Sequence, residues 1–239
     1  METYGLIGFP LKHSFSAKFF TEKFRNEQLE AEYLNFEIKD IQEIHHIILL
    51  NQQLKGLNIT IPYKERVIPF LDNISEEAKK IGAVNVIQIE RRPGDKCYFR
   101  LTGYNTDYIG FRQSISPLLN TAFHRKALIL GTGGASKAVA QAFTDMQVSW
   151  HYVSRTPGVN RFTYDDLTPS IIAEHTIIVN ASPVGTFPEI NYCPHIPYSF
   201  LTPRHLLYDL IYNPEETLFL QKGKNAVDDD NKPARHGKL

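Results

Sequence analysis

The sequence predicts an α/β fold in two parts, an N-terminal α/β domain followed by a doubly wound, Rossmann-type domain. Apolar runs of strand length alternate with segments of helical periodicity along most of the 239 residues. A glycine-rich turn at residues 131–135 joins one such apolar run directly to helix-forming residues. The strands and helices after this turn keep alternating, which is typical of a parallel sheet with crossover helices.

The first domain is predicted over residues 1–106. Its strands are expected where apolar runs end in Pro, Gly or polar residues, at 3–9, 31–38, 56–61, 86–90 and 97–101. The turn at 91–95 makes the last strand return antiparallel. Helices are expected at 17–26, after Asp40 and at 76–81, and a short helix is expected to begin at 63–65. Either Ser14 or Ser16 is predicted to cap the first helix, and Asp40 and Ser75 are the predicted N-caps of the next two. Gly82 is expected to end the third helix.

The second domain is predicted over residues 107–213. Its strands are expected at 127–130, 150–153, 177–180 and 206–211, and its helices at 109–119, 134–145 and 165–173. Residues 214–239 form a separate C-terminal segment. From Gly223 this segment is polar and contains three consecutive aspartates, so a disordered tail is expected.

The glycine turn is a candidate pyrophosphate site. Gly131 permits the tight turn, Gly133 lets the backbone approach a ligand closely, and Ser136 is small enough for helix–strand packing. The first-turn N–H groups and the positive end of the helix dipole favour a bound anion. The alternative is an ordinary glycine-containing βα turn without a ligand.

The residues after the second strand of this domain indicate which cofactor binds. An NAD-binding chain usually has Asp or Glu there to bind the ribose hydroxyls. Here the segment is Ser154, Arg155 and Thr156, and an arginine can pair with a 2′-phosphate that an acid would repel. We therefore expect NADP rather than NAD. Without the glycine turn upstream, Arg155 would be an ordinary solvated loop charge.

Lys64 and Asp107 are the candidate proton-transfer residues. Lys64 directly follows a predicted strand and Pro62, and the carboxyl ends of strands carry the sites of open α/β sheets. A carboxylate such as Asp107 can orient an ammonium for proton transfer. Each residue taken alone is also compatible with a surface charge. Four polar residues near the ends of predicted elements are suited to bind a hydroxylated substrate: Ser14, Ser16, Thr60 and Asn85. Helix capping or turn formation explains each of them better when it is taken alone.

Composition excludes several classes of protein. Lys plus Arg and Asp plus Glu are equal at 26 each, so no charge excess suggests a nucleic-acid or membrane-surface partner. The two cysteines are far apart in sequence and have no metal-ligand spacing. No leader or membrane-spanning run is expected. We expect a cytoplasmic protein with a small-molecule substrate, no metal, and a monomeric or homodimeric state.

Eight segments, in this order, resemble the shikimate dehydrogenase family over about nine-tenths of the chain. They are GLIGFPLKHSFS, LNITIPYK, IGAVNVI, GYNTDYIGF, ILGTGGASKAV, YVSRT, VNASPVGTFP and LLYDLIYNPEET. The resemblance implies a substrate-binding first domain and an NADP-binding second domain. It also implies reversible reduction of 3-dehydroshikimate to shikimate, with a hydride from NADPH and a proton from Lys64 aided by Asp107. Quinate/shikimate dehydrogenases and catalytically impaired metabolite-binding paralogues are the alternatives.

The resemblance also assigns individual residues. Substrate-binding positions match Ser14, Ser16, Thr60, Asn85, Asp107 and Tyr212. The pyrophosphate loop matches Gly131, Thr132, Gly133, Gly134 and Ala135, and the 2′-phosphate loop matches Ser154, Arg155 and Thr156. After FLQKGK the chain departs from the family, whose last helices return to the first domain and bring a substrate-binding glutamine. We therefore expect this chain to have lower activity and lower stability than a family member that has that segment.

Overall fold

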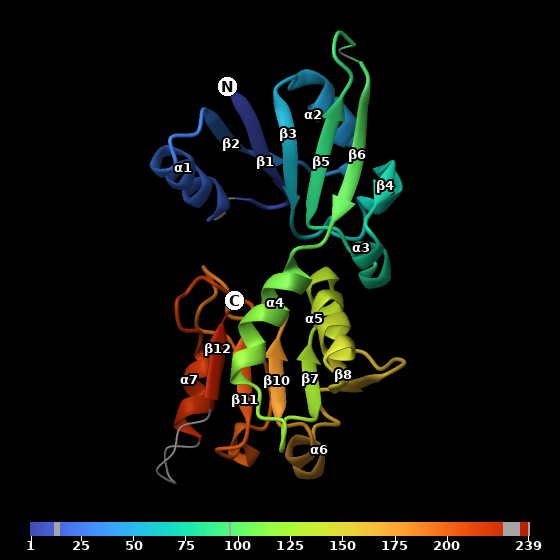
Figure 1. The fold of residues 1–239 in the computed structure, drawn as a ribbon. Helices are drawn as coiled ribbons and strands as arrows, with labels where there is room; N and C mark the ends of the chain where they lie inside the picture. Colours follow the sequence, from blue (N-terminus) through green and yellow to red (C-terminus); the bar gives the residue numbers. More distant parts are fainter. Residues whose placement is uncertain (12–14, 96, 227–234, 239) are drawn as a thin grey trace. The chain divides into compact units, whose positions relative to one another are not determined.

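The computed structural model describes residues 1–11, 15–95, 97–226 and 235–238. The chain divides into two compact units, Met1–Thr106 and Asp107–Leu239 (Figure 1). Each unit has its own sheet and its own helices, so the fold is mixed α/β as predicted. Within the described part of the chain, no helix has both the length and the apolar character needed to cross a membrane.

The first unit is built on a six-stranded mixed sheet with the order β2-β1-β3-β5-β6-β4. Its strands are β1 (Glu2–Gly8), β2 (Ala31–Glu37), β3 (Leu54–Ile59), β4 (Asn73–Ile74), β5 (Val86–Arg91) and β6 (Phe99–Tyr104). Strands β1, β2 and β3 are parallel, whereas β5 runs antiparallel to both β3 and β6. The antiparallel return of the last predicted strand is therefore confirmed.

Helices cover both faces of this sheet. They are α1 (Ser16–Asn26), α2 (Ile44–Leu50) and α3 (Glu76–Ile81), with short 3₁₀ turns at Ile41–Glu43 and Ile68–Phe70. Ile44 and Ile48 of α2 pack into the main core with Ile59 of β3. On the other face, Phe24 of α1 packs beside Tyr33 of β2. The inward positions in α2 are four residues apart, which is the spacing of one helix face.

The predicted caps of this unit are confirmed at two helices. Asp40 accepts a hydrogen bond from the Gln42 N–H at 3.0 Å, and Ser75 accepts one from the Ala78 N–H at 3.2 Å. Gly82 ends α3 in the left-handed conformation, with φ of 70°.

Two local predictions for this unit are wrong. The N-cap of α1 is Phe15, which makes no side-chain cap, so Ser16 begins the helix without capping it. The expected short helix at 63–65 is instead a series of turns that leads to a 3₁₀ turn at Ile68–Phe70. The reason is the buried Tyr63, whose hydroxyl donates to the Ile38 carbonyl at 2.7 Å and holds the chain in an irregular path. The other predicted cap of α1, Ser14, lies outside the described residues.

The second unit is built on a six-stranded, fully parallel sheet with the order β12-β11-β10-β7-β8-β9. Its strands are β7 (Lys126–Leu130), β8 (Ser149–Ser154), β9 (Arg161–Thr163), β10 (Ile177–Asn180), β11 (Leu206–Asp209) and β12 (Arg235–Lys238). The first strand is central, and successive strands are added first on one side and then on the other. This is the doubly wound order of dinucleotide-binding domains.

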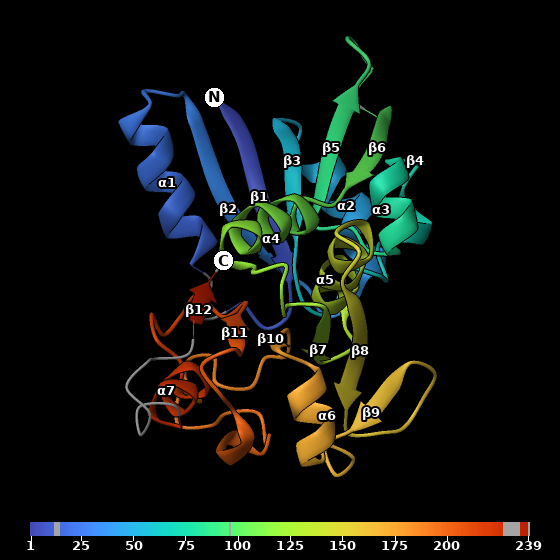
Figure 2. The same cartoon turned by 60° about the horizontal axis from the view of Figure 1, so that its bottom comes forward.

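The helices of the second unit lie on both faces of its sheet. They are α4 (Asp107–Ile115), α5 (Gly134–Asp145), α6 (Pro169–Glu174) and α7 (Leu218–Asn225), with 3₁₀ turns at Ser116–Leu118 and Tyr198–Phe200. Figure 2 shows α4 and α5 on one face and α6 and α7 on the other. Phe111 of α4 packs edge-to-face against Phe143 of α5 and Tyr208 of β11. Phe219 of α7 packs in the core of the opposite face.

Two predictions for the second unit need correction. The helix expected at 165–173 begins only at Pro169, because Thr168 caps it by accepting from the Ile171 N–H at 3.4 Å, and β9 precedes it. The tail from Gly223 was expected to be disordered, yet residues 223–225 belong to α7 and Arg235–Lys238 pairs with β11. Strand pairing uses backbone groups, so a polar sequence can form it. Gly237 lets the strand lie close to Leu118 and Tyr208, where a Cβ would not fit.

Candidate active site

Three predicted site residues of the first unit lie at one edge of its sheet. Thr60 directly follows β3, and its N–H donates to the Ile7 carbonyl of β1 at 2.9 Å. Asn85 directly precedes the antiparallel β5, and its carbonyl accepts from the Ile59 N–H at 2.8 Å. The Lys64 carbonyl accepts from the Val84 N–H at 2.7 Å, which ties the lysine turn to the same edge. The carboxyl ends of the parallel strands therefore bring Thr60, Lys64 and Asn85 together.

The Lys64 turn has a rigid base. Neighbouring Tyr63 is only 2% exposed, and its N–H donates to the Thr60 carbonyl at 2.9 Å. Burial raises the pKa of the Tyr63 phenol, and the negative charge of Asp40 raises it further. The phenol therefore stays protonated and keeps donating to Ile38, while the half-buried Lys64 is presented from a fixed backbone.

The side chain of Asn85 organises the end of this unit. Its Nδ2 donates to Thr106 Oγ1 at 3.0 Å, and its Oδ1 accepts from the Thr106 N–H at 2.8 Å. Buried Asn105 donates to the Ala83 carbonyl at 3.0 Å. Sequence reasoning did not find Asn105 and Thr106, although both stand in the GYNTDYIGF segment beside Asp107. These bonds fix the backbone immediately before Asp107, which is the first residue of α4.

Ser16 lies against the opposite face of the sheet from α2. Its side chain hydrogen-bonds with Tyr33, whose phenol also donates to Asn58 Oδ1 at 2.7 Å. Burial raises the pKa of the Tyr33 phenol, and the bond with Ser16 lowers it in part. Ser14 lies outside the described residues, so its predicted role has no structural counterpart here.

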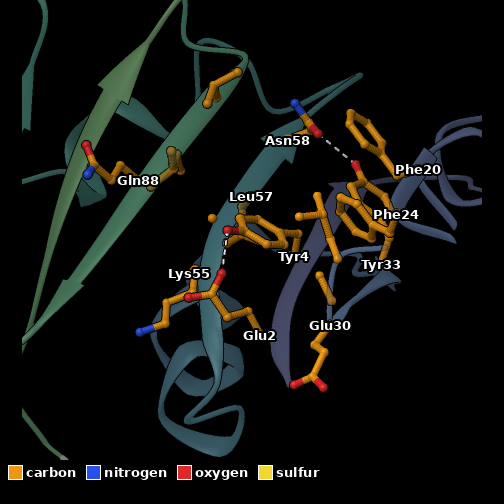
Figure 3. A pocket seen from close by; sticks show the side chains of 15 residues that line it. Glu2, Tyr4, Phe20, Phe24, Glu30, Tyr33, Lys55, Leu57, Asn58 and Gln88 are labelled. Atoms are coloured by element: carbon orange, nitrogen blue, oxygen red, sulfur yellow. Dashed lines mark hydrogen bonds between the residues drawn. The ribbon is translucent and has the colours of Figure 1, made fainter. Parts of the chain in front are cut away.

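An apolar pocket of about 470 Å³ lies beside Tyr33 and Asn58 on the α1 face of the sheet. Figure 3 shows aromatic side chains from α1, β1 and β2 along it, with Asn58 and Gln88 nearer β3 and β5. Its aromatic wall consists of Tyr4, Phe20, Phe24 and Tyr33. Thr60, Lys64 and Asn85 do not line it, so this pocket is separate from the predicted site edge.

The glycine turn of the second unit joins β7 to α5. Gly131 has φ of 110°, and a Cβ there would lie 3.1 Å from the Ala181 carbonyl oxygen, so glycine is required. At Gly133 a Cβ would meet no protein atom within 4 Å, which leaves open space beside the backbone. Gly133 is the N-cap of α5 and supplies no side-chain cap. Ser136 is fully buried in the third small position, as predicted for close packing.

The other predicted cofactor residues follow the neighbouring strands. Ser154 ends β8, accepts from the Thr156 N–H at 3.1 Å and donates to the Thr156 carbonyl at 2.9 Å. This closes a tight turn with exposed Arg155 at its tip. Tyr212 follows β11 and is 54% exposed. The glycine turn, the Arg155 turn and Tyr212 all stand after the carboxyl ends of parallel strands, where doubly wound sheets bind their ligands.

The fold and these loops define a two-unit α/β protein whose second unit is of the dinucleotide-binding class. Residues 6–87 match the family model described as the shikimate dehydrogenase substrate binding domain. The shikimate dehydrogenase (NADP(+)) of Clostridium beijerinckii is 39% identical, with 95% of this chain and 84% of that protein covered. The chain therefore belongs to the shikimate dehydrogenase family.

Solved structures agree with this assignment. A shikimate dehydrogenase from Peptoclostridium difficile is 35% identical, with a TM-score of 0.81 and coverage of 99% of this chain and 86% of that one. The enzyme from Thermus thermophilus, solved in complex with NADP(H) and shikimate, is 27% identical, with a TM-score of 0.75 and coverage of 95% and 85%.

Proposed function

We propose that this chain catalyses the reversible, NADP-dependent reduction of 3-dehydroshikimate to shikimate, with Lys64 and Asp107 as its proton-transfer residues. The observation that most directly supports this function is that Lys64, Thr60 and Asn85 lie together at one edge of the sheet in a chain of this family. A second unit with a nucleotide-binding turn supports the same activity.

The residues of the second unit fit NADP. The open space at Gly133 and the uncapped start of α5 suit a pyrophosphate, because phosphate oxygens can accept from the first-turn N–H groups. Exposed Arg155 suits the 2′-phosphate, with Ser154 and Thr156 shaping its turn. The nicotinamide, when bound, supplies or accepts the hydride. Thr132, Gly134 and Ala135 complete the loop, and Tyr212 is proposed to bind the substrate.

Lys64 of the first unit and Asp107, the first residue of the second unit, supply the proton chemistry. In the reductive direction the Lys64 ammonium donates a proton to the C3 carbonyl oxygen of the substrate as that oxygen becomes a hydroxyl. In the oxidative direction the neutral amine takes the hydroxyl proton back. Asp107 orients the ammonium, and Ser14, Ser16, Thr60 and Asn85 bind the substrate's hydroxyl and carboxylate groups. Because Asn85 is already bonded to Thr106, it also holds the chain segment that leads to Asp107.

Shikimate-dependent reduction of NADP⁺, followed by absorbance, tests this function. Lys64→Ala is expected to lower kcat by about 10²–10⁴-fold, the usual contribution of a positioned acid–base group. Calorimetric NADP⁺ binding is expected to be unchanged, because Lys64 belongs to the substrate unit. A wild-type chain that binds NADP⁺ but shows no rate above background would instead be a metabolite-binding paralogue. A higher kcat/KM with quinate, or with NAD⁺, would favour the quinate-dehydrogenase alternative.

We also propose a cytoplasmic enzyme that is a monomer or a homodimer. Cys97 and Cys193 are both free thiols, which suits a reducing compartment.

A further inference from the structure

A buried carboxylate, Asp209, ends β11 at the edge where the predicted cofactor loops begin. It is 0% exposed, and several donors converge on it. Oδ2 accepts from the Thr217 hydroxyl at 2.6 Å, and Oδ1 accepts from the Ile211 N–H at 3.0 Å. The Asn180 amide contacts both oxygens, at 3.2 and 3.3 Å. Burying a polar group costs free energy unless it is hydrogen-bonded, and these donors satisfy both oxygens of Asp209.

Asn180 extends this network into the loop after β10. Its Oδ1 accepts from the Ser182 N–H at 3.1 Å and from the Ser182 hydroxyl at 2.7 Å, while its Nδ2 also contacts the Val184 carbonyl at 3.3 Å. Because the Asn180 amide donates to Asp209, the carboxylate sets its orientation. The shape of the loop after β10 therefore depends on a residue of β11.

Thr217 extends the network into α7. It stands at the N-cap of α7, where a hydroxyl usually accepts from a first-turn N–H, yet it makes no such cap. Its hydroxyl donates to Asp209 instead. The segment between Asp209 and Thr217, which carries Tyr212, is thus held at both of its ends by one carboxylate.

The two loops are also joined to each other. The Phe187 N–H donates to the Asn213 carbonyl at 3.0 Å, and the Thr186 hydroxyl contacts the same carbonyl at 3.4 Å. Both loops expose apolar side chains, with Phe187 43% and Tyr212 54% exposed. A flat aromatic ring can pack on such side chains.

The strand order identifies what these loops face. A doubly wound sheet binds a dinucleotide across its switch point, with one mononucleotide over each half of the sheet. The switch point lies between β7 and β10, and Arg155 follows β8 on the adenosine side. The loops after β10 and β11 therefore belong to the half that receives the nicotinamide.

We propose that Asp209, with Asn180 and Thr217, positions the nicotinamide half of NADP by holding the loops after β10 and β11 in one arrangement. This inference rests on the proposed function. Asp209 is buried and acts through these loops, so it is a positioning residue. Loss of the network loosens the nicotinamide contacts and leaves the adenosine half, on β7 and β8, as it was.

Calorimetric titration of purified protein with two ligands separates these halves. NADP⁺ reports on the whole site, and adenosine 2′,5′-bisphosphate reports on the adenosine half alone. For Asp209→Asn we expect the Kd for NADP⁺ to rise about tenfold or more, since an amide nitrogen cannot accept the hydrogen bonds that the second carboxyl oxygen accepts. We expect the Kd for the bisphosphate to stay within about twofold, because its contacts are not changed.

Milder variants keep the test valid if Asp209→Asn does not fold. Thr217→Val removes one hydroxyl from the network and should raise the Kd for NADP⁺ several-fold, whereas Thr217→Ser keeps the hydroxyl and should restore the wild-type value. The matched control is Thr176→Val, since Thr176 is also buried and donates one hydroxyl bond, to the Phe123 carbonyl at 2.7 Å, but at the amino end of β10. That control should lower the melting temperature without changing either Kd.

Two results would overturn the proposal. One is an unchanged Kd for NADP⁺ in folded Thr217→Val, and the other is an equal rise for both ligands, which would mean a general loss of structure. A wild-type protein that binds neither ligand would instead overturn the proposed NADP-dependent function, and this inference with it.

Discussion

At the scale of single residues, cofactor choice is proposed to depend on one exposed side chain. Arg155 stands at the tip of a turn closed by the hydroxyl of Ser154, so its backbone is held while its guanidinium faces solvent. A solvated arginine contributes little to folding but can form a bidentate pair with a phosphate.

Arg155→Ser is expected to raise the KM for NADP⁺ by about 10–100-fold, because a charge-assisted bond to the 2′-phosphate is lost. The KM for NAD⁺ should change by less than about twofold, since NAD⁺ has no such phosphate. Initial rates of shikimate oxidation with each cofactor measure the difference. The control is Arg100→Ser, an exposed arginine of β6. An equal loss with both cofactors would contradict a 2′-phosphate role for Arg155.

At the scale of elements, the β7–α5 turn contains two glycines with different requirements. Gly131 has a positive φ and lies close to the Ala181 carbonyl, so the fold itself requires glycine there. Gly133 has an ordinary φ of −81° and open space around its Cα, so the fold does not. Glycine is instead expected at position 133 because a pyrophosphate would approach the backbone closely there.

Substitution by alanine should therefore change a different property at each position. Gly131→Ala is expected to lower the free energy of unfolding by about 1–3 kcal/mol, because an L-residue is strained at this φ. Gly133→Ala should leave stability within about 0.5 kcal/mol and weaken NADP⁺ binding about tenfold or more. Denaturant unfolding and calorimetry measure the two effects. Wild-type NADP⁺ affinity in Gly133→Ala would argue against pyrophosphate binding at this turn.

At the scale of the whole chain, acid sensitivity is expected to come from half-buried His151 and buried His175 of the second unit. His151 Nδ1 lies 3.0 Å from His175 Nε2, and His175 Nδ1 contacts the Ile171 carbonyl at 2.8 Å. A ring nitrogen facing a carbonyl must carry the proton, so neutral His175 accepts from His151. Burial lowers the pKa of both histidines, and the positive charge of Lys126 lowers both further, whereas Glu174 opposes this.

Stability is therefore expected to fall in mild acid. The unfolded chain takes up protons as the pH falls below about 6.5, whereas the folded sites resist protonation, so unfolding becomes more favourable. The stabilisation that these two neutral histidines give to the folded state is fully present above pH 6.5. The melting temperature should drop by a few degrees between pH 7.5 and pH 5.5, and less in His175→Gln. His46→Asn, at an exposed position, should keep the wild-type drop; a His175→Gln profile parallel to wild type would exclude this pair as the cause.

Much of the local architecture could be predicted from sequence because it depends on neighbours along the chain. The caps at Asp40 and Ser75 and the left-handed Gly82 involve side chains and backbone groups within a few residues. The strands β10 and β7 were predictable because buried parallel strands are continuous apolar runs. The turns around Lys64 were not, because Tyr63 bonds to Ile38, 25 residues away.

The sequence by itself determined the alternation of strands and helices, the glycine turn before α5 and the family, since periodicity and local motifs are written in adjacent residues. The tertiary structure alone decided that Thr60, Lys64 and Asn85 meet at one sheet edge. It also decided that the polar segment Arg235–Lys238 completes a sheet, and that Asp209 is buried beneath two loops. These contacts join residues far apart in the chain, and their energy depends on burial and pairing that no local pattern records.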